Sequence, residues 1–214
     1  MATILIYGAG GLGRIALDIF HAQARHRTVA FLDRDLSLCG EAIDDVPVRG
    51  NLSAARTLLA EGVSGAYVAI GCNETRCLIA SQLRMLGFDL VSPIHPTAVI
   101  AARAEVREHV MIGARAAICV HATVAAHAII ATNAIVEHDN VIGAGAFVEP
   151  AARLAGGVRL GERARVGIGA CVIPGRSIGA QATVGPGGIV IRDVPDGVTV
   201  RGAPARLPEL AAVE

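Results

Sequence analysis

Residues 130–160 read IATNAIVEHDNVIGAGAFVEPAARLAGGVRL, and within them an aliphatic residue returns at every sixth place. The same spacing extends in both directions, over seventeen consecutive positions from residue 94 to residue 190. An α-helix repeats about every 3.6 residues and a half-buried strand about every two, so neither explains a period of six. The aliphatic positions are Ile94, Ile100, Val106, Ile112, Ile118, Val124, Ile130, Val136, Ile142, Val148, Leu154, Leu160, Val166, Val172, Ile178, Val184 and Val190.

Small residues follow the same period. An alanine commonly stands four places after the aliphatic residue, as at Ala116, Ala134 and Ala152, and a glycine often follows the aliphatic directly, as at Gly143. This pattern fits a triangular coil in which each hexad is a short strand plus a turn, and three hexads complete a coil of 18 residues. The repeat therefore predicts an all-β parallel β-helix of a little over five coils.

The first ninety residues show a different pattern, which is typical of an α/β half-domain. Residues 3–7 predict a buried strand, the glycine-rich residues 8–13 a tight turn, residues 14–24 a helix, and residues 29–32 a second strand that ends at Asp33. Glycines let a backbone approach a phosphate, the helix N-terminus offers free N–H groups, and the acid can bind a ribose hydroxyl. The order predicts a Rossmann-like nucleotide-binding unit. Because only about ninety residues precede the repeat, we favour a nucleotide sugar over NAD as its ligand.

A further strand-like run, residues 66–70, ends in Gly71-Cys72-Asn73 and leads into a helical stretch. Strand ends of this kind line the ligand crevice of an open parallel sheet. Asn73 and Arg76 are therefore candidate ligand contacts, with a helix-capping role for Asn73 as the alternative. The expected substrate-binding set is Gly8, Gly10, Gly11, Leu12, Asp33, Arg34, Asn73 and Arg76.

Three segments are expected on this basis. Residues 1–92 form the Rossmann-like domain, residues 93–194 the β-helix, and residues 195–214 a C-terminal segment. The net charge is zero and the arginines are scattered, which argues against a nucleic-acid surface. The five cysteines have no zinc-binding or redox spacing, and no run approaches the ~18 apolar residues of a membrane span. Since the N-terminus also shows no leader, we expect a cytoplasmic protein.

His138 differs from the other six histidines in its surroundings. Glu137 and Asp139 flank it, and Gly156 follows 18 residues later, one coil on. In a stacked coil Gly156 lies above His138 without a side chain, which leaves a slot beside the imidazole for a thin ligand. By contrast, His109, His121 and His127 each come three places after a hexad aliphatic, at turns where an exposed polar residue is ordinary.

An imidazole at this place suits general-base chemistry because its pKa lies near neutrality. A carboxylate would hold the other ring nitrogen and fix the tautomer, and the N–H of Gly156 could bind an oxyanion. Asp139 is the first candidate for the carboxylate and Glu137 the second. Asp139 also lies one coil above His121, so a structural Asp139–His121 pair is a competing interpretation.

The chain resembles the sugar acyltransferases of the hexapeptide-repeat superfamily. It is most similar to the nucleotide-sugar N-acetyltransferases that act on 4-amino sugars in bacillosamine and perosamine biosynthesis. The stretches that carry the resemblance are 8–13, 69–76, 94–98, 136–140, 154–174 and 201–206.

The resemblance implies a left-handed β-helix, a homotrimer with acetyl-CoA bound between subunits, and an N-terminal domain that holds the nucleotide of the acceptor. It also implies Asp139 as the partner of the catalytic His138, and no metal. The cofactor-binding residues that it implies are Gly156, Gly157, Ile168, Pro186, Gly187, Arg201 and Pro204.

Three positions depart from the family pattern. Leu12 stands where a histidine is frequent, Phe147 replaces a second histidine nine residues after His138, and Ala131 replaces an asparagine, with Asn133 nearby. Other functions stay open at this point: a sugar O-acetyltransferase with a hydroxyl acceptor, a non-catalytic binding protein, and a zinc-dependent carbonic-anhydrase-like β-helix. The last would use His121 and His127, with His109 or His138 as the third ligand.

Overall fold

The computed structural model describes residues 1–206 and divides them into two compact units. The first consists of Met1–Pro96 together with Glu108–Met111, and the second of Thr97–Arg107 together with the chain from Ile112 onward. Residues 207–214, the end of the expected C-terminal segment, lie outside the described residues.

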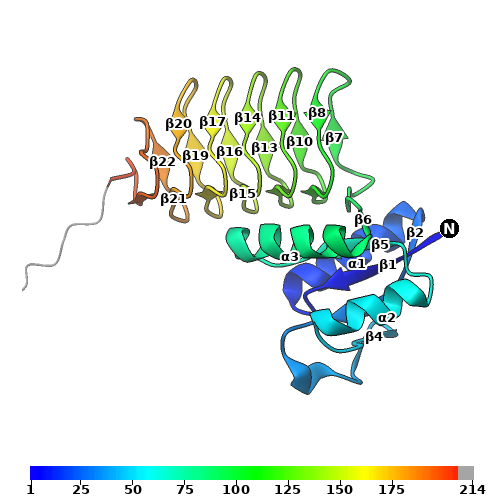
Figure 1. The fold of residues 1–214 in the computed structure, drawn as a ribbon. Coiled ribbons are helices and arrows are strands. Elements are labelled where there is room, and N and C mark those ends of the chain that lie inside the picture. Colours follow the sequence, from blue (N-terminus) through cyan, green and yellow to red (C-terminus); the bar gives the residue numbers. More distant parts are fainter. Residues whose placement is uncertain (207–214) are drawn as a thin grey trace, which may run out of the picture. The chain divides into compact units, whose positions relative to one another are not determined.

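The first unit is a four-stranded parallel sheet in the order β2-β1-β5-β6, with helices packed on it (Figure 1). The predicted strand, glycine turn, helix and strand are all present, so the α/β half-domain is confirmed. Its elements are β1 (Ala2–Tyr7), α1 (Gly11–Gln23), β2 (His26–Leu32), the 3-10 turn Leu36–Leu38, β3 (Ala42–Ile43), β4 (Val46–Pro47), the 3-10 turn Leu52–Ala54, α2 (Ala55–Ala60), β5 (Gly65–Val68), α3 (Asn73–Leu86) and β6 (Asp89–Leu90).

Burial explains these elements. The central strand β1 is an apolar run whose residues Ile4, Leu5 and Ile6 are fully buried, as expected for a strand covered on both faces. Helix α1 buries one apolar stripe that includes Leu17 and Phe20, and its other face is polar. No helix within residues 1–206 combines the length and the apolar character that crossing a bilayer requires.

The second unit is the predicted parallel β-helix, seen side-on in Figure 1. Three sheets of six, five and six short strands form its faces. Up to β19 each strand pairs in parallel with the strand 18 residues further on, as Ala117 does with Ile135, and β21 pairs with β23 16 residues on. The strands are β7 (Val99–Ile100), β8 (Glu105–Val106), β9 (Met111–Ile112), β10 (Ala117–Ile118), β11 (Thr123–Val124), β12 (Ile129–Ile130), β13 (Ile135–Val136), β14 (Val141–Ile142), β15 (Phe147–Val148), β16 (Arg153–Leu154), β17 (Arg159–Leu160), β18 (Arg165–Val166), β19 (Cys171–Val172), β20 (Ser177–Ile178), β21 (Thr183–Val184), β22 (Ile189–Val190) and β23 (Thr199–Val200).

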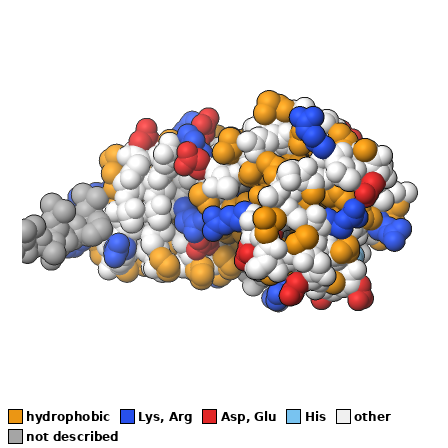
Figure 2. Space-filling view, turned by 60° about the horizontal axis from the view of Figure 1, so that its bottom comes forward, with side chains coloured by type: hydrophobic (Ala, Val, Ile, Leu, Met, Phe, Trp, Pro, Cys, Tyr) orange, Lys and Arg blue, Asp and Glu red, His pale blue; other side chains and the backbone are white. Residues whose placement is uncertain are grey.

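The hexad pattern sets the interior of this unit. From Ile112 to Val190 every predicted inward aliphatic side chain is at most 2% exposed, whereas Ile100, in the first coil, is 37% exposed. The alanines four places later, such as Ala134 and Ala152, are fully buried at the corners. In the view of Figure 2 much of the surface of the coils is white, because backbone and small polar residues make up much of each turn.

The turns repeat one backbone conformation. The third residue after each inward aliphatic has a positive φ in turn after turn, as at His121 (60°), Asp139 (59°) and Gly157 (69°). His109 occupies such a position too, with φ 55°, but it is not the exposed turn residue that was expected. It is fully buried in the first unit, where its Nε2 accepts a hydrogen bond from the Val68 N–H over 3.0 Å. On the side of β5 away from β1, the pairing with β6 ends at Ala66, so the imidazole takes the place of a strand carbonyl for Val68.

Candidate functional site

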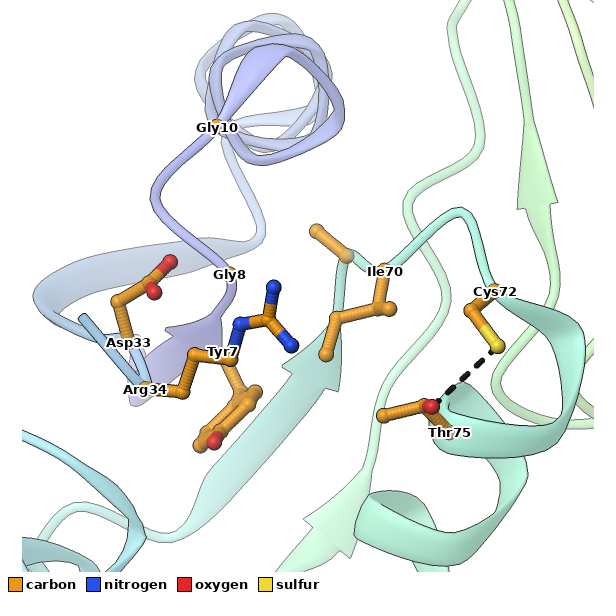
Figure 3. Close-up of a pocket in the computed structure, with 9 residues that line it drawn as sticks. Tyr7, Gly8, Gly10, Asp33, Arg34, Ile70, Cys72 and Thr75 are labelled. Atoms are coloured by element: carbon orange, nitrogen blue, oxygen red, sulfur yellow. Dashed lines mark hydrogen bonds between the residues drawn. The ribbon is translucent and has the colours of Figure 1, made fainter.

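A pocket of about 270 Å³ opens at the carboxyl ends of β1, β2 and β5, where the glycine turn meets the β5–α3 loop (Figure 3). Of the expected substrate-binding residues it contains Gly8, Gly10, Asp33 and Arg34. It also contains residues that the sequence pattern did not single out, namely Tyr7, Ala69, Ile70, Cys72 and Thr75. Tyr7, Ala69 and Ile70 lie at or just beyond strand ends, and Cys72 and Thr75 lie at the start of α3. All but Tyr7 fall within the stretch 69–76 that carries the family resemblance.

The glycine turn is shaped by close backbone packing. Gly8 has φ 111°, and a Cβ at this position would come within 2.6 Å of the Ala69 carbonyl oxygen, so no other residue fits. The carboxylate of Asp33 braces the turn, because the Ala9 N–H donates to Oδ2 over 2.7 Å and the Asp35 N–H donates to Oδ1 over 2.9 Å. Asp33 therefore lies in the pocket with each of its oxygens already accepting one backbone hydrogen bond.

Arg76 and Asn73 hold the loop beside the pocket and do not line it. The guanidinium of Arg76 is fully buried, donating to the Ile70 carbonyl over 2.8 Å and to Asn73 Oδ1 over 2.9 Å. Leu12 approaches Gly71 from the first turn of α1. The side chains of Arg76 and Asn73 therefore hold residues 70–73 in place, and Leu12 packs beside them.

Cys72 lies in the wall of the pocket, next to the start of α3. The hydroxyl of Thr75 donates to its Sγ over 3.3 Å (Figure 3), and this hydrogen bond lowers the pKa of the thiol. In the β-helix, burial raises the pKa of the Cys119 thiol, and the nearby Glu137 carboxylate raises it further. Glu137 therefore faces Cys119 on the neighbouring coil.

The second group of functional side chains lies on a turn of the β-helix, at His138. Its Nδ1 is 2.8 Å from Asp139 Oδ2, and the other oxygen, Oδ1, is 3.6 Å from Nδ1 of His121. The two pairings weighed from the sequence therefore occur together, and the shorter one is to His138. The hydrogen bond with His138 lowers the pKa of Asp139, so this carboxyl stays ionised at neutral pH.

Gly156 packs directly on the imidazole of His138. A Cβ at Gly156 would lie 2.4 Å from both Cε1 and Nε2 of the ring, so the absence of a side chain is required. The Gly157 N–H donates to the His138 carbonyl over 2.9 Å and fixes the two coils in register. The predicted stacking is therefore present, but the ring itself fills the space that the glycine leaves, where a slot beside the ring was expected.

The remaining cofactor-binding candidates lie on later coils. Ile168 is 55% exposed, and the Gly187 N–H donates to its carbonyl over 2.8 Å, which brings the turn of Pro186 and Gly187 beside it. Arg201 and Pro204 follow in the last described turn, where the Arg201 N–H donates to the Arg206 carbonyl over 2.8 Å.

Two of the three positions that depart from the family pattern, Phe147 and Ala131, lie in the β-helix. Phe147 is 7% exposed, and the guanidinium of Arg165 lies 5.1 Å from its ring centroid. Arg165 also pairs with Glu149 over 2.8 Å, and the second oxygen of Glu149 accepts from the Ile168 N–H over 3.0 Å. Ala131 is likewise buried. Phe147, which replaces the second histidine of the family pattern, therefore adds no imidazole near His138.

A zinc site built from three histidines finds no support in this geometry. Among residues 1–206 no group of three or more histidine, cysteine or acidic side chains is arranged to bind a metal. The Nε2 of His109 already accepts a hydrogen bond inside the first unit, and His121 lies against Asp139.

Comparison with known proteins gives a consistent picture. Residues 3–83 match the family model described as the PglD N-terminal domain. The whole chain is similar to PerB from Caulobacter crescentus, solved in complex with CoA and GDP-perosamine, with 39% identity over 97% of this chain and 98% of that one and a TM-score of 0.93.

Two further structures are similar along their full length. The acetyltransferase domain of PglB from Neisseria gonorrhoeae, in complex with acetyl coenzyme A, is 31% identical over 96% of this chain and 98% of that one, with a TM-score of 0.89. WeeI from Acinetobacter baumannii is 25% identical over 97% of this chain and 100% of that one, with a TM-score of 0.85. A comparison with the curated proteins gave no match.

Proposed function

Since the chain belongs to the hexapeptide-repeat family of nucleotide-sugar N-acetyltransferases, and is itself an acetyl-CoA:sugar N-acetyltransferase, we propose that it acetylates the amino group of a nucleotide-linked 4-amino sugar with His138 as general base. The observation that carries this proposal is the arrangement of the His138 imidazole between the Asp139 carboxylate and Gly156. One ring nitrogen is held by an ionised acid and the other faces a backbone without a side chain.

The reaction then follows from these positions. The neutral amine attacks the carbonyl carbon of the thioester, the C–N bond forms, and Nε2 of His138 accepts the proton that the nitrogen loses. Asp139, bonded to Nδ1, stabilises the imidazolium. The Gly156 N–H supports the oxyanion. The C–S bond breaks, and the proton passes to the leaving thiolate, which gives the acetamide and CoA. Both substrates are bound at once, so transfer is direct.

The pocket of the first unit is the proposed site for the nucleotide of the acceptor. Gly8 and Gly10 give a diphosphate close access to the backbone, and Arg34 offers a charge for it. PerB holds GDP-perosamine, which makes a GDP-linked amino sugar the first acceptor to test. The same relative favours an amine over the hydroxyl acceptor of an O-acetyltransferase.

We propose a homotrimer in which acetyl-CoA lies between subunits, along Ile168, Pro186, Gly187, Arg201 and Pro204. In one chain His138 and Asp139 are more than half exposed, as is Ile168, which is the exposure expected of surfaces that a neighbouring subunit covers. The cytoplasmic location stays a prediction.

An acceptor panel tests the function. Acetyl-CoA is supplied with GDP-perosamine, with UDP-linked 4-amino sugars, and with the matching 4-hydroxy sugars, and CoA release is followed with a thiol reagent while the product is identified by mass. We expect acetamide formation on an amino sugar only. Acetylation of the hydroxy sugars with none of the amino sugars would show the proposed acceptor to be wrong.

A further inference from the structure

One polar side chain lies inside the β-helix next to the catalytic turn. Asn140 is fully buried, at a corner position that alanine occupies one coil earlier, at Ala122, and on another corner at Ala134 and Ala152. Alanine therefore occurs at this corner of the repeat, although the larger Val158 occupies it one coil later. A buried amide is tolerated only when it is hydrogen-bonded, so its partners show what it does.

Both ends of the Asn140 amide bind the turn of the next coil. The Val158 N–H donates to Oδ1 over 2.6 Å, and Nδ2 donates to the Leu154 carbonyl over 3.3 Å. The two bonds bracket Ala155, Gly156 and Gly157. In several other turns of the β-helix the fourth residue after the inward aliphatic donates to the carbonyl three residues earlier, as Ala134 does to Ala131 over 3.0 Å. The Val158 N–H instead donates to the side chain of Asn140, which lies one coil earlier.

We propose that Asn140 is a positioning residue for acetyl transfer, which sets the backbone of Gly156 against the imidazole of His138. Gly156 is the middle residue of the bracketed turn and the one that touches Cε1 and Nε2 of the ring. Without the amide, the buried Val158 N–H needs another acceptor, and the nearest precedent is the turn carbonyl used elsewhere in the repeat. Closing the turn in that way moves Gly156 relative to Nε2. The inference rests on the proposed role of His138.

Two substitutions separate positioning from stability. Asn140→Ala installs the residue that the repeat itself uses, and we expect kcat to fall by about tenfold or more while KM for either substrate changes by less than about threefold. Ile112→Val, in the first turns of the β-helix and fully buried, serves as the control that lowers Tm without touching the turn. Wild-type kcat in Asn140→Ala, at a Tm loss no greater than that of the control, overturns the proposal.

Asn140→Asp gives a second, pH-dependent test. A protonated carboxyl can accept from the Val158 N–H and donate to the Leu154 carbonyl, whereas an ionised one cannot donate. Burial raises the pKa of such a carboxyl. The ratio of variant to wild-type kcat should therefore fall as the pH rises, with the wild type correcting for titration of His138. A ratio that is constant with pH contradicts the hydrogen-bond account.

A spectroscopic readout keeps this test separate from the proposed function. The imidazole signals of His138, assigned by comparison with His138→Ala, should shift in Asn140→Ala and stay in place in Ile112→Val. If the wild type acetylates no nucleotide amino sugar, the proposed function fails, but the imidazole shift still decides whether Asn140 sets the surroundings of His138. An unmoved signal in Asn140→Ala overturns the inference whichever acceptor is used.

Discussion

The role proposed for His138 rests on where the turn places its neighbours. The left-handed conformation of Asp139, at φ 59°, turns its carboxylate back between two imidazoles on adjacent coils. Of these imidazoles, His138 makes the shorter contact and also packs on Gly156, whereas His121 contacts the carboxylate only at 3.6 Å. The distances thus distinguish two histidines of similar exposure, and they support the proposal that His138 is the base.

Replacing the two histidines tests this assignment. We expect His138→Ala to lower kcat by roughly two to four orders of magnitude, because the amine then loses its proton acceptor. His121→Ala should lose far less, since Asp139 keeps its bond to His138. Steady-state kinetics with circular dichroism as a folding check gives the comparison. Near-normal turnover in His138→Ala would remove this residue from the mechanism.

The carboxylate next to His138 gives a prediction on pH. The pKa of Asp139 is lowered in the folded chain, mainly by the hydrogen bond with His138, so the stabilisation it provides is complete above the unfolded pKa of about 3.8 and is lost as the pH falls through the lower folded value. Because the folded value lies below 3.8, Asp139 stays charged throughout a range of about pH 5 to 9.

Asp139→Asn removes this charge and allows the ring to take the wrong tautomer. We expect kcat to fall by about a hundredfold or more, with the apparent pKa of the base shifted downward because the imidazolium loses its partner. Glu137→Gln is the matched control, since Glu137 faces Cys119. Equal losses in both variants would mean that Asp139 has no special role.

The β-helix could be predicted from the sequence because each hexad buries one aliphatic side chain. The six-residue spacing of these aliphatics therefore identifies the residues of its interior. The α/β half-domain could be predicted from its strand, glycine turn and helix. Side-chain contacts between residues far apart in the sequence could not be predicted in this way. His109 has the sequence pattern of an exposed turn residue, yet its side chain is buried. It accepts a hydrogen bond from the N–H of Val68, which lies 41 positions away in the sequence. Arg76 follows a strand end, as ligand contacts do, yet its guanidinium donates hydrogen bonds to the Ile70 carbonyl and to Asn73 Oδ1.

The β5–α3 loop carries a thiol that can report on nucleotide binding. Because its pKa is lowered by Thr75, Cys72 should react with iodoacetamide at a lower pH than Cys119, whose pKa is raised. Peptide mass spectrometry after brief alkylation measures both. A nucleotide diphosphate in the pocket should slow the reaction of Cys72 and leave Cys119 unchanged.

Thr75→Val provides the control for this experiment. It removes the hydroxyl that donates to Sγ, so alkylation of Cys72 should slow in the absence of nucleotide. The nucleotide prediction is contradicted if GDP and UDP, at concentrations that support turnover, leave the alkylation rate of Cys72 as it was.

Assembly determines whether the site is complete within one chain. The exposed turn of His138 and the exposed Ile168 lie on separate coils, and in the proposed trimer the turn of one subunit faces the later coils of the next. Light scattering should then give about three times the chain mass of 21.9 kDa. A closed ring of this kind makes three equal sites, each built from two subunits.

Mixing two inactive variants distinguishes a shared site from one contained in a single subunit. His138→Ala lacks the base, and Ile168→Glu places a charge in the proposed acetyl-CoA groove at an exposed position that should not disturb folding. When the two are unfolded and refolded together, a site is intact wherever an unaltered His138 meets an unaltered Ile168 from the next subunit. Random assembly gives about a quarter of the sites in that state, so roughly a quarter of wild-type activity should return. Variants refolded separately and then combined should stay inactive. If the refolded mixture is also inactive although it forms trimers, each site lies within one chain and the shared groove is wrong.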